Sequence, residues 1–183
     1  MQSKTTEYFS AIQCHVVSPL ENSTIAEHCF AAALLVFGAI DGLGRLIHTD
    51  REASPGDRFK AYLQRLGEVY VAHADAIWKL RNSLAHNAVN VAAFMSKAEG
   101  AELHHLEEDR GRIFVHTRVL AKDFTTSFNA LSEELEQNQA LATCVENRLD
   151  YAELTDPSWR KMEVKTTEPP PIRFVQGPAG GLG

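Results

Sequence analysis

Cysteine is scarce in this sequence, and the three that occur cannot form a disulfide framework. Cys14, Cys29 and Cys144 are far apart and odd in number, a pattern that is typical of reduced thiols in a cytosolic protein. No CxxC pair is present, and adjacent side chains such as Cys14 and His15 would point apart on a helix, which argues against a zinc site. The sequence therefore predicts no metal and no cofactor.

Long apolar runs and an excess of positive charge are also missing. The most apolar run, CFAAALLVFGAI, covers residues 29–40, whereas a helix that spans a bilayer needs about 20 apolar residues. The first residues, MQSKTTEYFS, lack the apolar segment of a signal peptide, so we expect a cytoplasmic protein. The formal net charge of −6 excludes a strong general attraction for nucleic acid, and any RNA contact must depend on a local basic patch.

Apolar residues are plentiful enough for the core of one domain, at 44% of 183 residues, and most recur at helical spacing. Thr24 and Glu27 should form a capping box. Pro19 should end the first helix, and Asp123 should cap a later one. The expected helices cover about residues 3–17, 24–48, 54–66, 69–86 and 138–154, with another that follows Asp123.

Two further local signals mark helix boundaries in the middle of the chain. Ser54 followed by Pro55 is typical of a helix start, because Ser can cap the first free N–H groups and Pro suits the first helical position. Gly67 indicates a kink or a break. We therefore expect the helix that starts near Pro55 to be separated from the helix that carries residues 69–86.

The periodicity changes after Asn87. The segments GAELHHL and GRIFVHTRV flank EEDRG, which predicts a β-hairpin over about residues 101–118, and residues 91–96 should add a third short strand. Residues 155–183 form a Pro- and Gly-rich segment that predicts an extended tail. The sequence thus indicates a mainly α fold over residues 1–154, a helical bundle with a small β-hairpin inserted before the last long helix.

The stretch LRNSLAHN, residues 80–87, places three chemically useful side chains close together. The guanidinium of Arg81 can present a fork of donors to phosphate oxygens. The imidazole of His86 can accept or donate a proton. Asn82 lies four residues before His86, on the same face of a helix, and can orient that imidazole. These residue types suit metal-independent cleavage of RNA, in which the 2′-hydroxyl attacks the neighbouring phosphorus.

Helix geometry restricts how this stretch can act. Arg81 and His86 lie about 140° apart around a straight helix, because each residue turns by about 100°. One helix therefore cannot direct both side chains at one atom unless Arg81 reaches around or the helix ends early. A second copy of the chain could otherwise supply the missing half of the site.

The motif and its surroundings resemble the HEPN superfamily, whose signature is an Arg, a polar residue and a His after four to six intervening residues. Arg81, Asn82 and His86 match these positions, and the segments AIDGLGRL and RFKAYL are similar to that family's layout. The resemblance covers roughly residues 22–145. It implies an α-helical bundle, a homodimer whose motifs face each other and, in many members, metal-independent endoribonuclease activity in toxins or defence proteins; other members are non-catalytic adaptors.

Purely structural roles for the same residues stay open. Asp41 lies in the most apolar helix, where an unpaired carboxylate would be costly, so we expect it to pair with Arg45 or with Arg81 and to have a structural or orienting role. His86 and Asn87 could form a helix C-cap. Trp78 could stack on a base or belong to the core.

Two functions follow from the motif and its alternatives. The first is a metal-independent endoribonuclease, a hydrolase of single-stranded RNA with an Arg81, Asn82 and His86 site at the interface of a homodimer, controlled by an antitoxin or a regulatory protein. The second is a non-catalytic dimeric adaptor that binds a protein or a nucleotide. The bare Arg-to-His spacing also occurs from Arg110 to His116, in the expected hairpin, where the helical context is missing.

Overall fold

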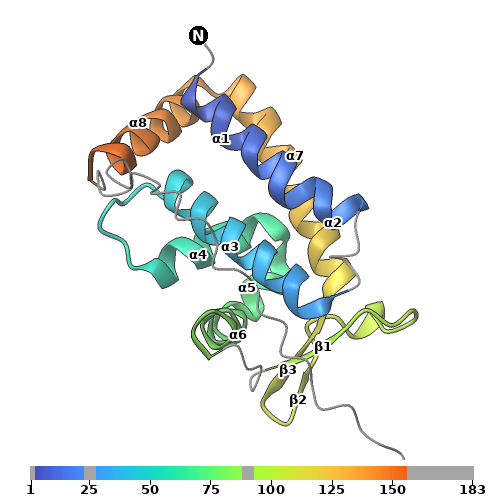
Figure 1. The fold of residues 1–183 in the computed structure, drawn as a ribbon. Helices are drawn as coiled ribbons and strands as arrows, with labels where there is room; N and C mark the ends of the chain where they lie inside the picture. Colours follow the sequence, from blue (N-terminus) through green and yellow to red (C-terminus); the bar gives the residue numbers. More distant parts are fainter. Residues whose placement is uncertain (1–2, 23–27, 88–92, 156–183) are drawn as a thin grey trace, which may run out of the picture.

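Helices dominate the structure, a computed structural model that describes residues 3–22, 28–87 and 93–155. A mainly α fold with a small β-sheet is confirmed (Figure 1). Helix α3 (Cys29–Ile47) runs through the middle, with α4 (Pro55–Leu63) and α6 (Ala74–Asn87) against one side and α7 (Thr117–Gln137) and α8 (Gln139–Thr155) against another. The tail predicted over residues 155–183 lies outside the described residues from residue 156 onward.

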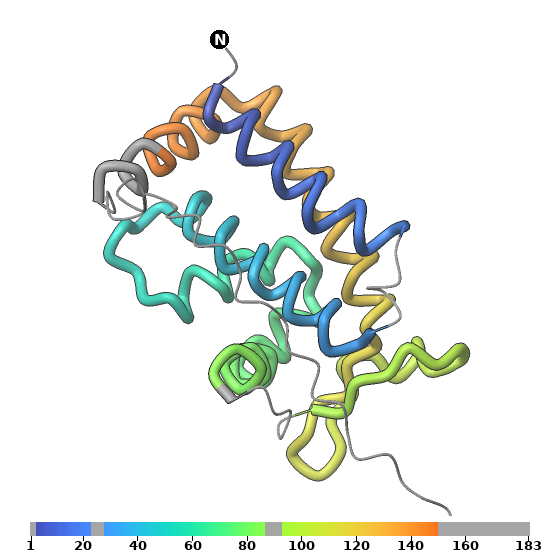
Figure 2. The backbone as a smooth tube through the Cα atoms, viewed as in Figure 1, coloured from blue at the N-terminus to red at the C-terminus, as the bar shows by residue number. Residues whose placement is uncertain are grey.

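The first helical segment continues through Pro19, so the prediction that this proline ends the helix is wrong. Helix α1 (Lys4–Ile12) passes into a π-helical turn (Gln13–Val17) and then into α2 (Ser18–Asn22). In the wide turn the Ser18 N–H donates to the Gln13 carbonyl. A π turn can absorb a residue such as Pro19, which has no N–H to donate to the preceding turn. The whole segment runs alongside α7 (Figure 2), and Phe9 stacks on Phe128 with ring centroids 5.4 Å apart.

Helix α3 forms the core because it is apolar on most sides. Its buried residues include Val36, Ile40 and Leu43, none of which is exposed to solvent. By length and hydropathy this helix could cross a membrane, but about half of its most apolar window is buried inside the fold. That burial is typical of a helix that packs in the core of a fold. The capping box predicted at Thr24 and Glu27 lies outside the described residues.

The predicted boundaries between residues 54 and 87 are largely confirmed. Ser54 caps α4 by accepting a hydrogen bond from the Asp57 N–H, with Pro55 in the first turn. Gly67 separates the helices at a φ of 125°, a positive φ that glycine adopts more easily than other residues. The helix predicted over residues 69–86 is interrupted at His73, which separates α5 (Glu68–Ala72) from α6.

The β-sheet differs from the predicted hairpin in its first strand. Strand β1 (Ala93–Ser96) confirms the short strand predicted at 91–96. It pairs in parallel with β3 (Arg112–His116), and β2 (Glu108–Asp109) pairs antiparallel with β3. A 3₁₀ turn (Glu102–His104) stands where GAELHHL predicted a strand. The hairpin is therefore confined to β2 and β3, joined at Arg110 and Gly111 with φ of 51° and 75°, as a tight hairpin turn requires.

Helix α7 begins directly after the sheet, so the prediction that Asp123 caps this helix is wrong. His116 is the cap, and its Nδ1 accepts a hydrogen bond from the Val119 N–H at 3.4 Å. Asp123 lies inside the helix instead, where its carboxylate accepts a hydrogen bond from Tyr70. The last predicted helix, over residues 138–154, is confirmed as α8.

Candidate functional site

Arg81 lies on α6 and is held by the neighbouring helix α3. Its Nε donates to Asp41 Oδ2 at 2.6 Å, and its Nη2 forms an ion pair with the same oxygen. Its Nη1 donates to Asn82 Oδ1 at 2.9 Å. A guanidinium has five N–H groups, and these contacts use three of them. One N–H on each terminal nitrogen therefore makes no hydrogen bond within the described part of the chain.

Asp41 pairs with Arg81, one of its two expected partners. The other, Arg45, lies exposed on α3. The side chains of Asp41 and Arg81 keep about a quarter of their surface in solvent, at 24% and 23%. Burial raises the pKa of the Asp41 carboxyl, and the hydrogen bond and charge of Arg81 offset part of that rise. A pair at the edge of the core contributes less to stability than a fully buried one, and its main effect is to fix the guanidinium in place.

Trp78 supports Arg81 from the same helix. The Arg81 guanidinium lies over the indole, 5.2 Å from its centroid. The indole also packs against Phe59 of α4, at 5.3 Å between centroids, and fills the space beside Gly56, where a Cβ would come within 3.3 Å of it. Because these neighbours already cover the indole, the packing favours a role for Trp78 in positioning Arg81 over stacking on a base.

His86 lies one and a half turns further along α6 and is exposed. No hydrogen bond or ion pair joins its imidazole to any residue within the ranges 3–22, 28–87 and 93–155, and the Asn82 amide oxygen is directed to Arg81 instead. The expected contact between Asn82 and His86 is thus not made within this chain. Helix α6 ends at Asn87, and the residues that would complete a C-cap lie outside the described ranges.

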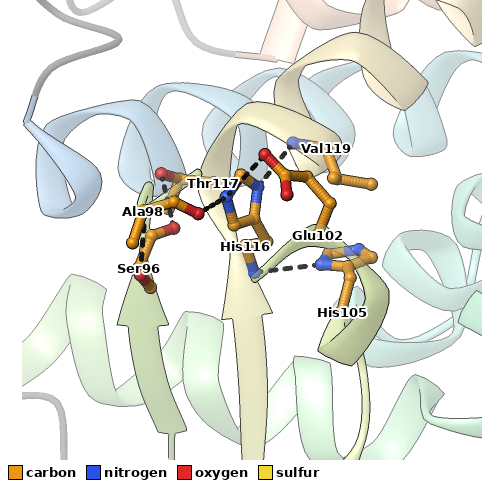
Figure 3. Close-up of polar contacts among 7 residues, drawn as sticks. All are labelled: Ser96, Ala98, Glu102, His105, His116, Thr117 and Val119. Carbon is orange, nitrogen blue, oxygen red and sulfur yellow. Dashed lines mark hydrogen bonds and ion pairs between the residues drawn. The ribbon is translucent and has the colours of Figure 1, made fainter. Parts of the chain in front are cut away.

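A second polar cluster joins the sheet to the helices, and the sequence did not indicate it. The His116 N–H donates to His105 Nδ1 at 3.0 Å (Figure 3). This acceptor role leaves the proton on His105 Nε2, which lies 2.9 Å from the Tyr70 hydroxyl, and Tyr70 in turn donates to Asp123 Oδ2 at 2.7 Å. Both ring nitrogens of His105 therefore make hydrogen bonds, and the chain of hydrogen bonds ends at the Asp123 carboxylate. The imidazole has no nitrogen left to act as a base.

His116, from the second Arg-to-His match, is sealed in the same cluster. It has no solvent exposure, and its Nε2 donates to the Ala98 carbonyl at 3.1 Å, with Glu102 Oε1 at 3.7 Å (Figure 3). Arg110 lies exposed in the hairpin turn. The two residues do not form a site, and the cluster's role is to attach the sheet to α5 and α7.

This cluster makes the fold sensitive to acid. Burial, together with the charges of His116 and His73, lowers the pKa of His105 to about 4. An unfolded histidine titrates near 6.5, so the unfolded state binds more protons between those values and stability is lost as pH falls from about 6.5 towards 4. We expect the free energy of unfolding to fall by about 1–2 kcal/mol between pH 7 and 5 through this residue.

Denaturant titrations at several pH values measure this loss. His105→Gln should flatten the dependence, because an amide can replace both hydrogen bonds without titrating. His28→Gln, at an exposed histidine, serves as the control and should keep the wild-type slope. An unchanged slope in His105→Gln would show that another group causes the loss.

A cavity of about 640 Å³ lies between α1, α7 and α8, away from the Arg81 site. Apolar side chains, among them Phe9 and Phe128, line it together with hydroxyl and amide groups and the carboxylates of Glu136 and Glu146. None of its described lining residues is Lys or Arg. Glu146 also accepts hydrogen bonds from the Lys4 and Thr5 N–H groups at 3.1 Å. The negative charge disfavours phosphate in this cavity, so it is not a site for RNA.

No group of three or more His, Cys, Asp or Glu side chains that could hold a metal ion occurs within residues 3–22, 28–87 and 93–155. Comparisons with protein-family models, with curated proteins and with solved structures found no significant match. The function must therefore be argued from the site itself. Arg81 is a fixed cation with two N–H groups that no described residue accepts, and His86 is an exposed imidazole further along the same helix, not in contact with it. The His105 cluster is closed, and the α1–α8 cavity carries carboxylates.

Proposed function

We propose that this protein is a metal-independent endoribonuclease of the HEPN type that cleaves single-stranded RNA at the interface of a homodimer. The observation that carries the proposal is the state of Arg81. Asp41 and Trp78 hold its guanidinium in one position, yet two of its N–H groups make no hydrogen bond within the described part of the chain. A cation prepared in this way can stabilise charge that develops on a phosphate.

His86 would supply the proton transfer. Its exposed imidazole on the same helix would remove the proton from the 2′-hydroxyl, whose oxygen then attacks the neighbouring phosphorus. The bond from phosphorus to the 5′ oxygen breaks, a protonated His86 imidazole donates a proton to that oxygen, and a 2′,3′-cyclic phosphate remains. Arg81 would bind the oxygens of the phosphate as it becomes more negative.

A second copy of the chain would allow Arg81 and His86 to act on the same phosphate. Arg81 and His86 lie about 140° apart around that helix, and α6 lies at the edge of the molecule (Figure 1). In a dimer that brings two α6 helices together, His86 of one copy can reach the phosphate that Arg81 of the other copy binds. We propose that this dimer acts in the cytoplasm, where its three free cysteines would stay reduced. Its role would be that of a toxin or defence protein whose activity a regulatory protein controls.

A non-catalytic dimeric adaptor is the second candidate. The net charge of −6 opposes the approach of RNA at long range, and Asp41 already satisfies part of Arg81. In this role the Arg81 surface would bind an acidic segment of a protein partner or a nucleotide, without turnover.

Digestion of labelled single-stranded RNA in EDTA distinguishes these functions. Under the nuclease proposal the purified protein cuts the RNA, leaves 2′,3′-cyclic phosphate ends and spares DNA of the same sequence, because DNA lacks the 2′-hydroxyl. Intact RNA after prolonged incubation with dimeric, folded protein would contradict the nuclease and favour the adaptor. Cleavage of both RNA and DNA would exclude the proposed chemistry.

A further inference from the structure

Arg58 of α4 lies close to the site, and the sequence motif does not include it. The backbone of α4 packs tightly on α3 at Gly44, where any Cβ would overlap the Arg58 carbonyl oxygen. Gly44 is three residues after Asp41, so it lies nearly one helical turn further along the same face. This close approach places the backbone of Arg58 against α3 within about one helical turn of Asp41.

The contacts between α4 and α6 fix the position of Arg58 relative to Arg81. Trp78 of α6 packs beside Gly56, two residues before Arg58, and Lys60 forms an ion pair with Asp75 at the start of α6. Both arginines therefore project from helices that are joined on either side of the site. Their spacing is set by the fold and does not depend on a flexible loop.

Arg58 is a second positive charge that acts on Asp41. Arg58 is near enough to Asp41 for its positive charge to lower the pKa of that carboxyl, in addition to the larger effects of burial and Arg81. The Arg58 side chain is half-buried and makes no hydrogen bond or ion pair with any residue that the structure describes. Asp41 is thus influenced by two arginines but pairs with Arg81 alone, which leaves the donors of Arg58 without a partner among the described residues.

We propose that Arg58 and Arg81 form a binding site for two consecutive phosphates of single-stranded RNA. Arg81 would contact the phosphate that is cleaved, and Arg58 would contact the phosphate beside it, which positions the strand without taking part in proton transfer. The proposal builds on RNA as the substrate of the proposed function, but it does not depend on cleavage. Two guanidiniums at a fixed spacing suit a polyanion with regularly spaced charges.

Binding of a single-stranded 2′-O-methyl RNA tests this site, because that probe has no 2′-hydroxyl and cannot be cleaved. Arg58→Gln should weaken binding about tenfold at low salt. It should also reduce the slope of log K against log salt by about 0.7, the contribution of one phosphate contact on a single strand. Arg58→Lys should keep the wild-type slope. Arg45→Gln is the matched control, since it removes the same charge from an exposed position on α3 and should change neither quantity.

The outcomes separate this inference from the proposed function. If the wild type cleaves RNA and Arg58→Gln binds the probe with wild-type affinity and slope, the two-phosphate site is wrong and the nuclease stands. If the wild type cleaves nothing but Arg58→Gln still loses the salt-dependent contact, the nuclease is wrong and the site stands. A wild type that does not bind the probe, or whose probe is displaced by an acidic peptide and not by unlabelled RNA, would overturn the two-phosphate site.

Discussion

His86→Ala should lower the rate of metal-independent RNA cleavage by about 10²–10⁴-fold, the usual contribution of a general acid or base. The imidazole is exposed and forms no hydrogen bond with a described residue, so its removal leaves no buried group unsatisfied. We therefore expect the melting temperature to stay close to that of the wild type. Rates from labelled RNA in EDTA, with melting curves on the same preparations, measure both quantities.

The matched control is His15→Ala, which removes an exposed histidine from the π-helical turn between α1 and α2. It should cleave RNA at the wild-type rate. Equal cleavage by the wild type and His86→Ala would mean that another site or a contaminant cuts the RNA. A large fall in melting temperature in His86→Ala would instead assign this residue to the fold.

The sequence predicts that Asp41 needs a cationic partner, but it leaves two arginines as candidates. An acid in the most apolar helix needs a cation, and the chain offered Arg45 one turn away and Arg81 on another helix. The structure selects Arg81, and Arg45 points to solvent. The sequence also predicts the mainly α fold, the start of α4 and the break at Gly67, since each depends on residues that are neighbours in the sequence.

The features that the sequence did not indicate depend on contacts between distant segments. GAELHHL was predicted to form a strand, but Leu106 is buried and adopts a φ of 67°, while Leu103 is 87% exposed on a 3₁₀ turn. Asp123 has the local features of a helix cap, yet it accepts a hydrogen bond from Tyr70, 53 residues earlier. Arg58 becomes a candidate for phosphate binding only because α4 packs on α3 at Gly44. The spacing of residues within a short segment of sequence cannot predict contacts between residues that are far apart in the chain.

Arg81→Lys should lower the rate of RNA cleavage by about 10²-fold, the effect of removing one donor that stabilises transition-state charge. An ammonium group can still pair with Asp41, but it cannot also donate to Asn82 and present two parallel N–H groups to a phosphate. Because the charge is kept, we expect the loss mainly in kcat, with little change in KM or in the melting temperature. Steady-state kinetics on the same RNA measures the two constants, and a wild-type kcat in this variant would remove Arg81 from the chemistry.

Mixing the two inactive variants tests whether the site is shared between copies. A heterodimer of His86→Ala and Arg81→Lys still contains one intact pair, with Arg81 from the first chain and His86 from the second. If these two side chains act across the interface, as we propose from their separation around α6, the mixture should regain part of the wild-type rate after the subunits exchange. If they act within one chain, no heterodimer holds an intact site and the mixture stays inactive. Activity that does not return after verified exchange would therefore contradict the dimer-interface site.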